Sequence, residues 1–208
     1  MRIFLRLPFL PDGLNLHVRD AEGVKVDGTW RRRLGLALAL VGWLHLIAFG
    51  ACWWLTVGVG YHGAGGYLAI WCAELLGALG ILRVCAGSWP GDEQGRLVAR
   101  VWLSYLLLAA NLCTMNGLRG HQMFELFPAM ASLASFGFLM MTFAVDGRFF
   151  AAVLVMFVSG LLMAAWHLHA YLIFAVAWWT VLNGIALAIQ PRSVRREVPG
   201  RETAVAAS

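Results

Sequence analysis

Six long apolar stretches dominate this chain and limit what it can fold into. They cover residues 34–57, 66–86, 101–118, 126–145, 149–166 and 170–189. Each is close to the roughly 20 helical residues that, at about 1.5 Å rise per residue, cross a hydrocarbon layer of ~30 Å. The sequence therefore predicts an all-α fold: a polytopic membrane helical bundle with six transmembrane helices.

The basic residues are distributed unevenly around these stretches. If the chain crosses a membrane six times, all of its 16 Lys and Arg residues except Arg119 fall on one side. Positively charged residues mark the cytoplasmic side of membrane proteins. We therefore expect both termini in the cytoplasm and the protein as a multi-pass component of the cell's inner (plasma) membrane.

Composition supports a single membrane domain with short ends. The chain is 61% apolar and 13% charged, whereas an ordinary soluble domain has about 25% charged residues. We divide it into a cytoplasmic N-terminal segment (1–33), a six-helix transmembrane domain (34–189) and a disordered cytoplasmic tail (190–208). Neither end segment is long enough to bury a core of its own. The excess positive charge fits anchoring at anionic lipid headgroups, so the lipid bilayer is the expected partner and nucleic acid is not.

One carboxylate, Glu74, lies well inside a predicted span. A charge there is costly, so its side chain should face the interior of the bundle and find a partner or a proton. At 1.5 Å per residue, His45 and Asn111 reach roughly the same depth on two other spans. We predict an intramembrane polar cluster of His45, Glu74 and Asn111. Such a cluster can be a proton or cation site, or it can hold helices together by hydrogen bonds.

Residues for metal, haem or catalytic chemistry are scattered. His45 is the one histidine deep in a span, so no second histidine is available at matched depth for haem. His167 and His169 can be combined with His62 or His121 in a metal site, but we expect polar caps at the membrane surface instead. The four cysteines form no CxxC pair and are expected to be buried apolar residues. The sequence thus predicts no cofactor, no metal site, no catalytic residues and no enzymatic activity.

Residues 96–189 carry a pattern of apolar and aromatic residues that resembles a known kind of membrane region. It includes Val101 and Trp102, the run Leu126, Phe127 and Pro128, the segment 132–138, and the residues Phe174, Trp178, Trp179 and Gly184. The pattern is similar to the polytopic C-terminal membrane region of bacterial serine/threonine kinases of the eukaryotic-like type. The kinase domain itself is absent, so the resemblance implies a membrane part without phosphotransfer residues.

These observations lead to two functional hypotheses. The first is a non-catalytic integral membrane module, either a signalling-associated anchor or sensor or an accessory subunit of a membrane complex. Such a module is expected to bind a membrane protein partner or to form a homo-oligomer. The alternative is a small transporter or channel that uses Glu74 as an intramembrane polar or proton site.

Overall fold

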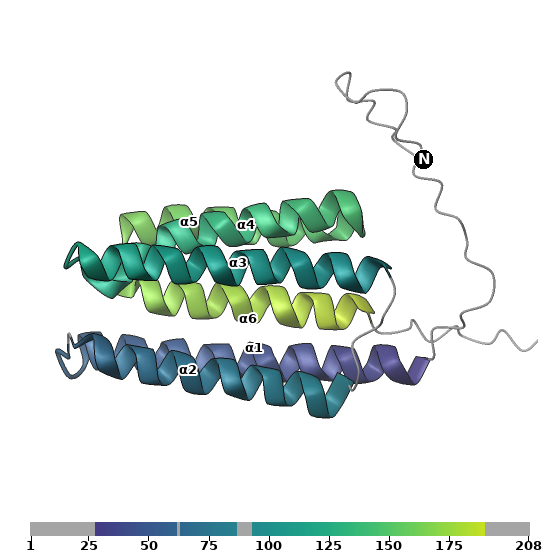
Figure 1. Cartoon of the computed structure of the whole chain (residues 1–208), viewed down its shortest axis with the longest axis horizontal. Coiled ribbons are helices and arrows are strands. Elements are labelled where there is room, and N and C mark those ends of the chain that lie inside the picture. The colour runs from purple at the N-terminus through teal and green to yellow at the C-terminus, as the bar shows by residue number, and fades with distance from the viewer. Residues whose placement is uncertain (1–27, 62, 87–92, 190–208) are drawn as a thin grey trace, which may run out of the picture.

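The computed structural model of the chain describes residues 28–61, 63–86 and 93–189, and these residues are helical apart from short connections (Figure 1). Most of the predicted N-terminal segment and the predicted tail at 190–208 lie outside the described residues. The elements are α1 (Gly28–Val57), α2 (Ala64–Ile81), the π-helical turn η1 (Leu82–Ala86), α3 (Glu93–Leu118), the 3-10 turn η2 (Met123–Leu126), α4 (Phe127–Ala144), the 3-10 turn η3 (Gly147–Phe149), α5 (Phe150–Ala165), the 3-10 turn η4 (His167–His169) and α6 (Ala170–Ile189).

Six helices of the described chain are long and apolar enough to cross a membrane. The spans are Arg32–Val57, Gly65–Cys85, Arg96–Leu118, Met123–Ala144, Gly147–Ala165 and His167–Ile189. Two of the described connections contain a glycine in the left-handed region, at Gly60 (φ 67°) and Gly120 (φ 68°). The prediction of an all-α chain with six membrane-capable helices is confirmed.

Two helices begin earlier than the apolar pattern predicts. α1 starts at Gly28 rather than near residue 34, and α3 starts at Glu93 rather than near residue 101. The extra turns are polar and contain the arginines next to the spans. A helix continues until its sequence stops it, and neither 28–33 nor 93–100 contains a proline. The apolar pattern marks the part of each helix that is apolar enough to cross a membrane, and not the end of the helix.

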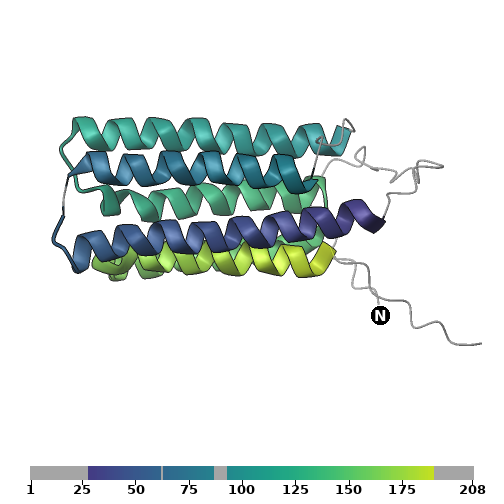
Figure 2. The same cartoon turned by 90° about the horizontal axis from the view of Figure 1, so that it is seen from below.

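The helices lie lengthwise beside one another as an elongated bundle (Figure 1). α4 and α5 form one side, α1 and α2 form the opposite side, and α3 and α6 lie between them. The view from below places α3 at the edge of the bundle (Figure 2). The most extensive contacts join α1 to α6 and α4 to α5, whereas α2 packs mainly on α1 and α3 mainly on α4. Four helices thus form the core, with α2 and α3 attached to it.

Small residues allow α1 to approach α6 closely. A β-carbon placed on Gly35 would lie 3.2 Å from the carbonyl oxygen of Ala186. One placed on Gly42 would lie 2.8 Å from the Asn183 amide nitrogen and 3.3 Å from the Leu182 β-carbon. Such glycine and alanine contacts bring helix backbones together in membranes, where packing rather than water exclusion holds helices together.

A second close contact joins α4 to α5. The Ser135 hydroxyl of α4 donates a hydrogen bond to the Val153 carbonyl of α5 at 3.1 Å. Nearby, Gly160 of α5 faces Ala131 of α4, and a β-carbon on this glycine would lie 3.6 Å from that alanine. Ala131 and Ala134 are fully buried. This pair of helices therefore has both small-residue packing and an interhelical hydrogen bond.

The α1–α6 contact generates a first prediction. Replacing Gly42 with Leu should lower the free energy of unfolding by about 1–3 kcal/mol, because the new side chain must displace groups of α6. Gly50→Leu is the matched control on the same helix, since a β-carbon placed on Gly50 would have no neighbouring atom within 4 Å. Thermal denaturation in detergent should show a clear loss of stability for Gly42→Leu alone. Equal losses in both variants would contradict the proposed packing.

Candidate functional site

The structure brings two of the three predicted polar residues together. His45 lies in the middle of α1 and Glu74 in the middle of α2, and the His45 Nδ1 and Glu74 Oε1 atoms are 2.5 Å apart. Both side chains are shielded, and Glu74 is only 8% exposed. The contact lacks the geometry of a hydrogen bond, and within the described residues Nδ1 has no hydrogen-bond partner. The two side chains are thus in close polar contact inside the bundle.

Asn111 is not part of this pair. Its side chain is exposed on α3, whereas Tyr105 and Ala109 of the same helix are buried. Successive helical residues turn by about 100°, so Asn111 points away from the face that carries Ala109. Depth in the membrane follows from the number of residues along a helix. The face that a residue occupies depends instead on how its helix is packed. Asn111 was predicted from its position along α3 to meet the pair, but it lies on the outward face of that helix.

Aromatic rings enclose the His45 side of the pair. The imidazole lies 5.3 Å from the ring of Phe49 and 5.4 Å from that of Trp178, between ring centroids. Trp178 in turn contacts Trp102 and Tyr105 of α3, at 5.6 and 6.1 Å. Tilted and edge-on arrangements at these distances are favourable for aromatic pairs. Trp178 therefore connects the polar pair on α1 and α2 to the inner face of α3.

The contact between Trp178 and His45 was not predicted from the sequence. The indole Nε1 of Trp178 belongs to a set of buried polar atoms that have no hydrogen-bond partner in the described part of the chain. The other members are His45 Nδ1, the Tyr171 hydroxyl and the indole nitrogens of Trp53, Trp71 and Trp179. Only the position of α6 against α1 reveals that one of these tryptophans covers the polar pair.

A smaller polar cluster lies at the end of α1 and was not predicted. The Thr56 hydroxyl donates to the Cys52 carbonyl at 2.9 Å and is 2.8 Å from the Tyr67 hydroxyl. The Tyr67 hydroxyl also donates to the carbonyl of Tyr61. These bonds tie the start of α2 to the end of α1, and the Tyr67 ring stacks on Tyr171 of α6. The sequence did offer a signal for this cluster, because Thr56, Tyr61 and Tyr67 lie in or beside the predicted connection between the first two spans.

The remaining histidines of the described chain are dispersed. His121 lies 3.0 Å from Glu125, His167 contacts the ring of Phe124, and His169 contacts the ring of Trp53. Among the described residues no group of three His, Cys, Asp or Glu side chains is placed to hold a metal ion. His62, one of the histidines considered above, lies outside them.

The cysteines differ in their burial. Cys52 is buried, as the sequence predicts, and all four cysteines are free thiols. Cys72 is exposed on α2, and Cys85 and Cys113 are partly exposed. The expectation that all four are buried within the protein was therefore wrong for α2 and α3, because these two helices present much of their surface outward.

Two half-open grooves lie elsewhere on the bundle. One, of about 440 Å³, lies between α1 and α6 and is lined by Arg32, Gly35, Leu36, Ala39, Asn183, Ala186 and Leu187. The other, of about 240 Å³, lies between α3 and α4. Neither is lined by His45 or Glu74. The polar pair therefore lies away from both grooves.

The pair places an imidazole and a carboxyl group in contact inside the bundle. Two polar groups that contact each other cost less in a membrane than either group would alone. No protein-family model, curated protein or solved structure matches this chain. The site is thus defined by its contacts alone.

The contact between His45 and Glu74 generates a second prediction. Glu74→Ala should destabilise the bundle by about 1–3 kcal/mol, because it leaves a buried imidazole without its partner. Glu74→Gln should cost less, since an amide keeps polar contact with His45. Unfolding of the single variants and of His45→Ala/Glu74→Ala should be strongly non-additive, with the double variant no worse than the poorer single one. Additive losses would show that the two residues do not interact.

Proposed function

We propose that this chain is a non-catalytic integral membrane module, either a signalling-associated anchor or sensor or an accessory subunit of a membrane complex. The observation that carries the proposal is the enclosure of the His45–Glu74 pair. The pair joins α1 to α2 beneath aromatic rings and lines neither groove. In this position it acts as an attachment between helices.

The outer faces of α2 and α3 support a role in association. Each of these helices packs mainly on one neighbour, and only 6% of each predicted span is buried within the chain. The exposed faces are available to lipid and to the helices of another membrane protein. Helix faces in a bilayer associate through packing and interhelical hydrogen bonds. A module of this kind acts through its faces rather than through an internal cavity.

The signalling part of the proposal rests on the resemblance of residues 96–189 to the membrane regions of bacterial eukaryotic-like kinases. The same residues form α3 to α6. The non-catalytic part rests on the sequence, which offers one isolated intramembrane carboxylate and dispersed histidines in place of a nucleophile with an acid or base in reach.

We also propose that both termini face the cytoplasm and that the membrane is the cell's inner (plasma) membrane. The arginine distribution supports this orientation. The turn at Gly147 would then lie in the cytoplasm, and those at His121 and Leu168 outside it.

The orientation gives a third prediction. Single cysteines at His121, Gly147 or Leu168 should be introduced into a chain whose exposed or partly exposed Cys72, Cys85 and Cys113 are replaced by Ala. A membrane-impermeant maleimide added to intact cells should label the cysteines at 121 and 168 but not the one at 147. All three should be labelled after the membrane is opened. Labelling at 147 in intact cells would refute the proposed threading.

A small transporter is the second candidate, and the contact between a carboxylate and an imidazole inside a membrane favours it. Proton pathways use such groups. In that case, protonation of Glu74 and His45 would be coupled to the opening of a path between α1 and α2.

A fourth prediction distinguishes the module from the transporter by complex formation and by proton flux. For the module, affinity purification from native membranes under mild detergent should recover a stable complex, and the pure chain in liposomes should move no protons or cations above the level of empty liposomes. Glu74→Gln should leave the complex intact. Proton flux from reconstituted wild-type chain that is lost in a folded Glu74→Gln variant would overturn the module and support the transporter.

A further inference from the structure

The outward face of α3 carries a regular line of exposed residues. Its members follow one another at alternating intervals of four and three positions. We name this line the α3 seam, and it consists of Arg100, Ser104, Leu107, Asn111, Thr114 and Leu118. At about 100° per residue these positions stay on one side of the helix. The opposite side carries Trp102 and Tyr105, which contact Trp178 of α6. The seam therefore faces away from the bundle.

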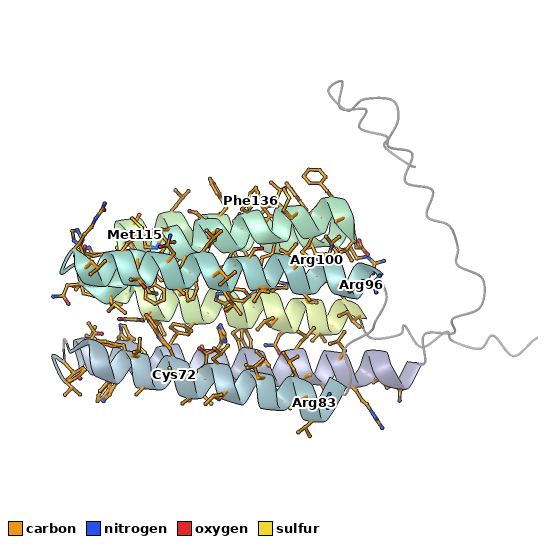
Figure 3. All side chains as sticks on the ribbon, in the orientation of Figure 1. Cys72, Arg83, Arg96, Arg100, Met115 and Phe136 are labelled. Atoms are coloured by element: carbon orange, nitrogen blue, oxygen red, sulfur yellow. The ribbon has the colours of Figure 1, made fainter. Side chains whose placement is uncertain are left out.

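When two helices pack along their length, the residues in contact recur at alternating intervals of four and three positions. This spacing is found in coiled coils and in pairs of membrane helices. In this chain no other described helix covers the seam, because its residues are exposed throughout. Only the first part of the seam borders another helix: Arg100 and Ser104 help to line the groove between α3 and α4, opposite Phe136 and Gly137 of α4. Figure 3 labels Arg100 and Met115 on α3 and Phe136 on α4.

Asn111 is the unusual member of the seam. It lies roughly 10 Å along the helix from Leu118, at 1.5 Å per residue, and so well within the span. Its amide has no hydrogen-bond partner among the described residues, whereas the hydroxyl of nearby Thr114 donates to the Ala110 carbonyl at 2.9 Å. An amide that faces hydrocarbon without a partner costs several kcal/mol. Asn111 therefore calls for a hydrogen-bond partner that the described residues do not supply.

We propose that the α3 seam is a homodimer interface, in which α3 packs in parallel against α3 of a second copy and the two Asn111 amides hydrogen-bond to each other. This inference rests on the proposed function, a module that associates through its outer faces, and it names a second copy of the chain as the partner on the outer face of α3.

Symmetry favours a second copy as the partner. Two copies with the same orientation in a membrane are related by a two-fold axis along the membrane normal, which makes their α3 helices parallel and sets each seam residue against itself. An amide both donates and accepts, so Asn111 is complementary to its own copy. A single polar asparagine in such a line is also known to set the register of paired helices. The like charges of Arg100 lie at the end of the span, where long side chains can separate into the headgroup region.

Disulfide cross-linking in native membranes tests the interface. In the chain that lacks Cys72, Cys85 and Cys113, Leu107→Cys on the seam should form a dimer on treatment with a membrane-permeant oxidant. Leu106→Cys is the matched control, because Leu106 is also exposed (46%, against 65% for Leu107) but lies about 100° around the helix. The dimer band from Leu107→Cys should exceed that from Leu106→Cys about tenfold.

Substitution of the amide tests its role. Asn111→Leu in the Leu107→Cys chain should reduce the cross-linked dimer about tenfold, whereas Asn111→Gln should retain most of it. Both variants should keep the thermal stability of the monomer, because the side chain at 111 makes no hydrogen bond within the described bundle. Equal cross-linking at positions 106 and 107, or an Asn111→Leu chain that dimerises normally, would overturn the proposal.

The outcomes separate this inference from the proposed function. Recovery of a stable complex with a different protein, without cross-linking at 107 between copies, would sink the homodimer and leave the module standing. A specific dimer at 107 in a chain that conducts protons would leave the homodimer standing and sink the module.

Discussion

The close approach of α1 to α6 is the contact on which the rest of the structure depends. It joins the first and last spans of the bundle, and it requires Gly35 and Gly42 to lie against the backbone and side chains of α6. This approach also sets Trp178 against His45. Since α2 packs mainly on α1, the position of Glu74 depends on the same contact. Packing of small residues thus decides which side chains of α6 lie against the polar pair.

The polar pair shows how a membrane bundle can tolerate a carboxylate. Glu74 is isolated on its own helix, and its cost falls because His45 lies 2.5 Å away and the rings of Phe49 and Trp178 pack against the imidazole. A carboxyl–imidazole pair with a single proton is neutral overall in either arrangement of that proton. The interaction links α2, which has few other contacts, to the core. Its position between helices is the basis for treating it as an attachment in the proposed function.

α3 has two chemically different faces. Its inner face supplies Trp102 and Tyr105 to the aromatic contacts around Trp178. Its outer face is mostly apolar, with exposed leucines such as Leu107 and Leu118, but it also carries Asn111, and an unpartnered amide is costly on a helix exposed only to lipid. The inner face is explained by contacts within the chain, and the outer face is what suggests a partner outside it.

Much of the architecture could be predicted from the sequence, because the length and apolarity of a span are local properties. Six membrane-capable helices, and the depth of His45, Glu74 and Asn111, follow from counting residues at about 1.5 Å each. The extra turns at the starts of α1 and α3 were missed, since hydropathy reports the membrane and not the helix end. Which polar residues meet is not local: it depends on the rotation of each helix about its axis, and that rotation is set by contacts such as Gly42 with Leu182 and Trp178 with Trp102. The sequence by itself therefore determined how many membrane-capable helices there are and how far along its helix each polar group lies, whereas only tertiary packing decided that Glu74 turns inward to His45 and Asn111 turns outward.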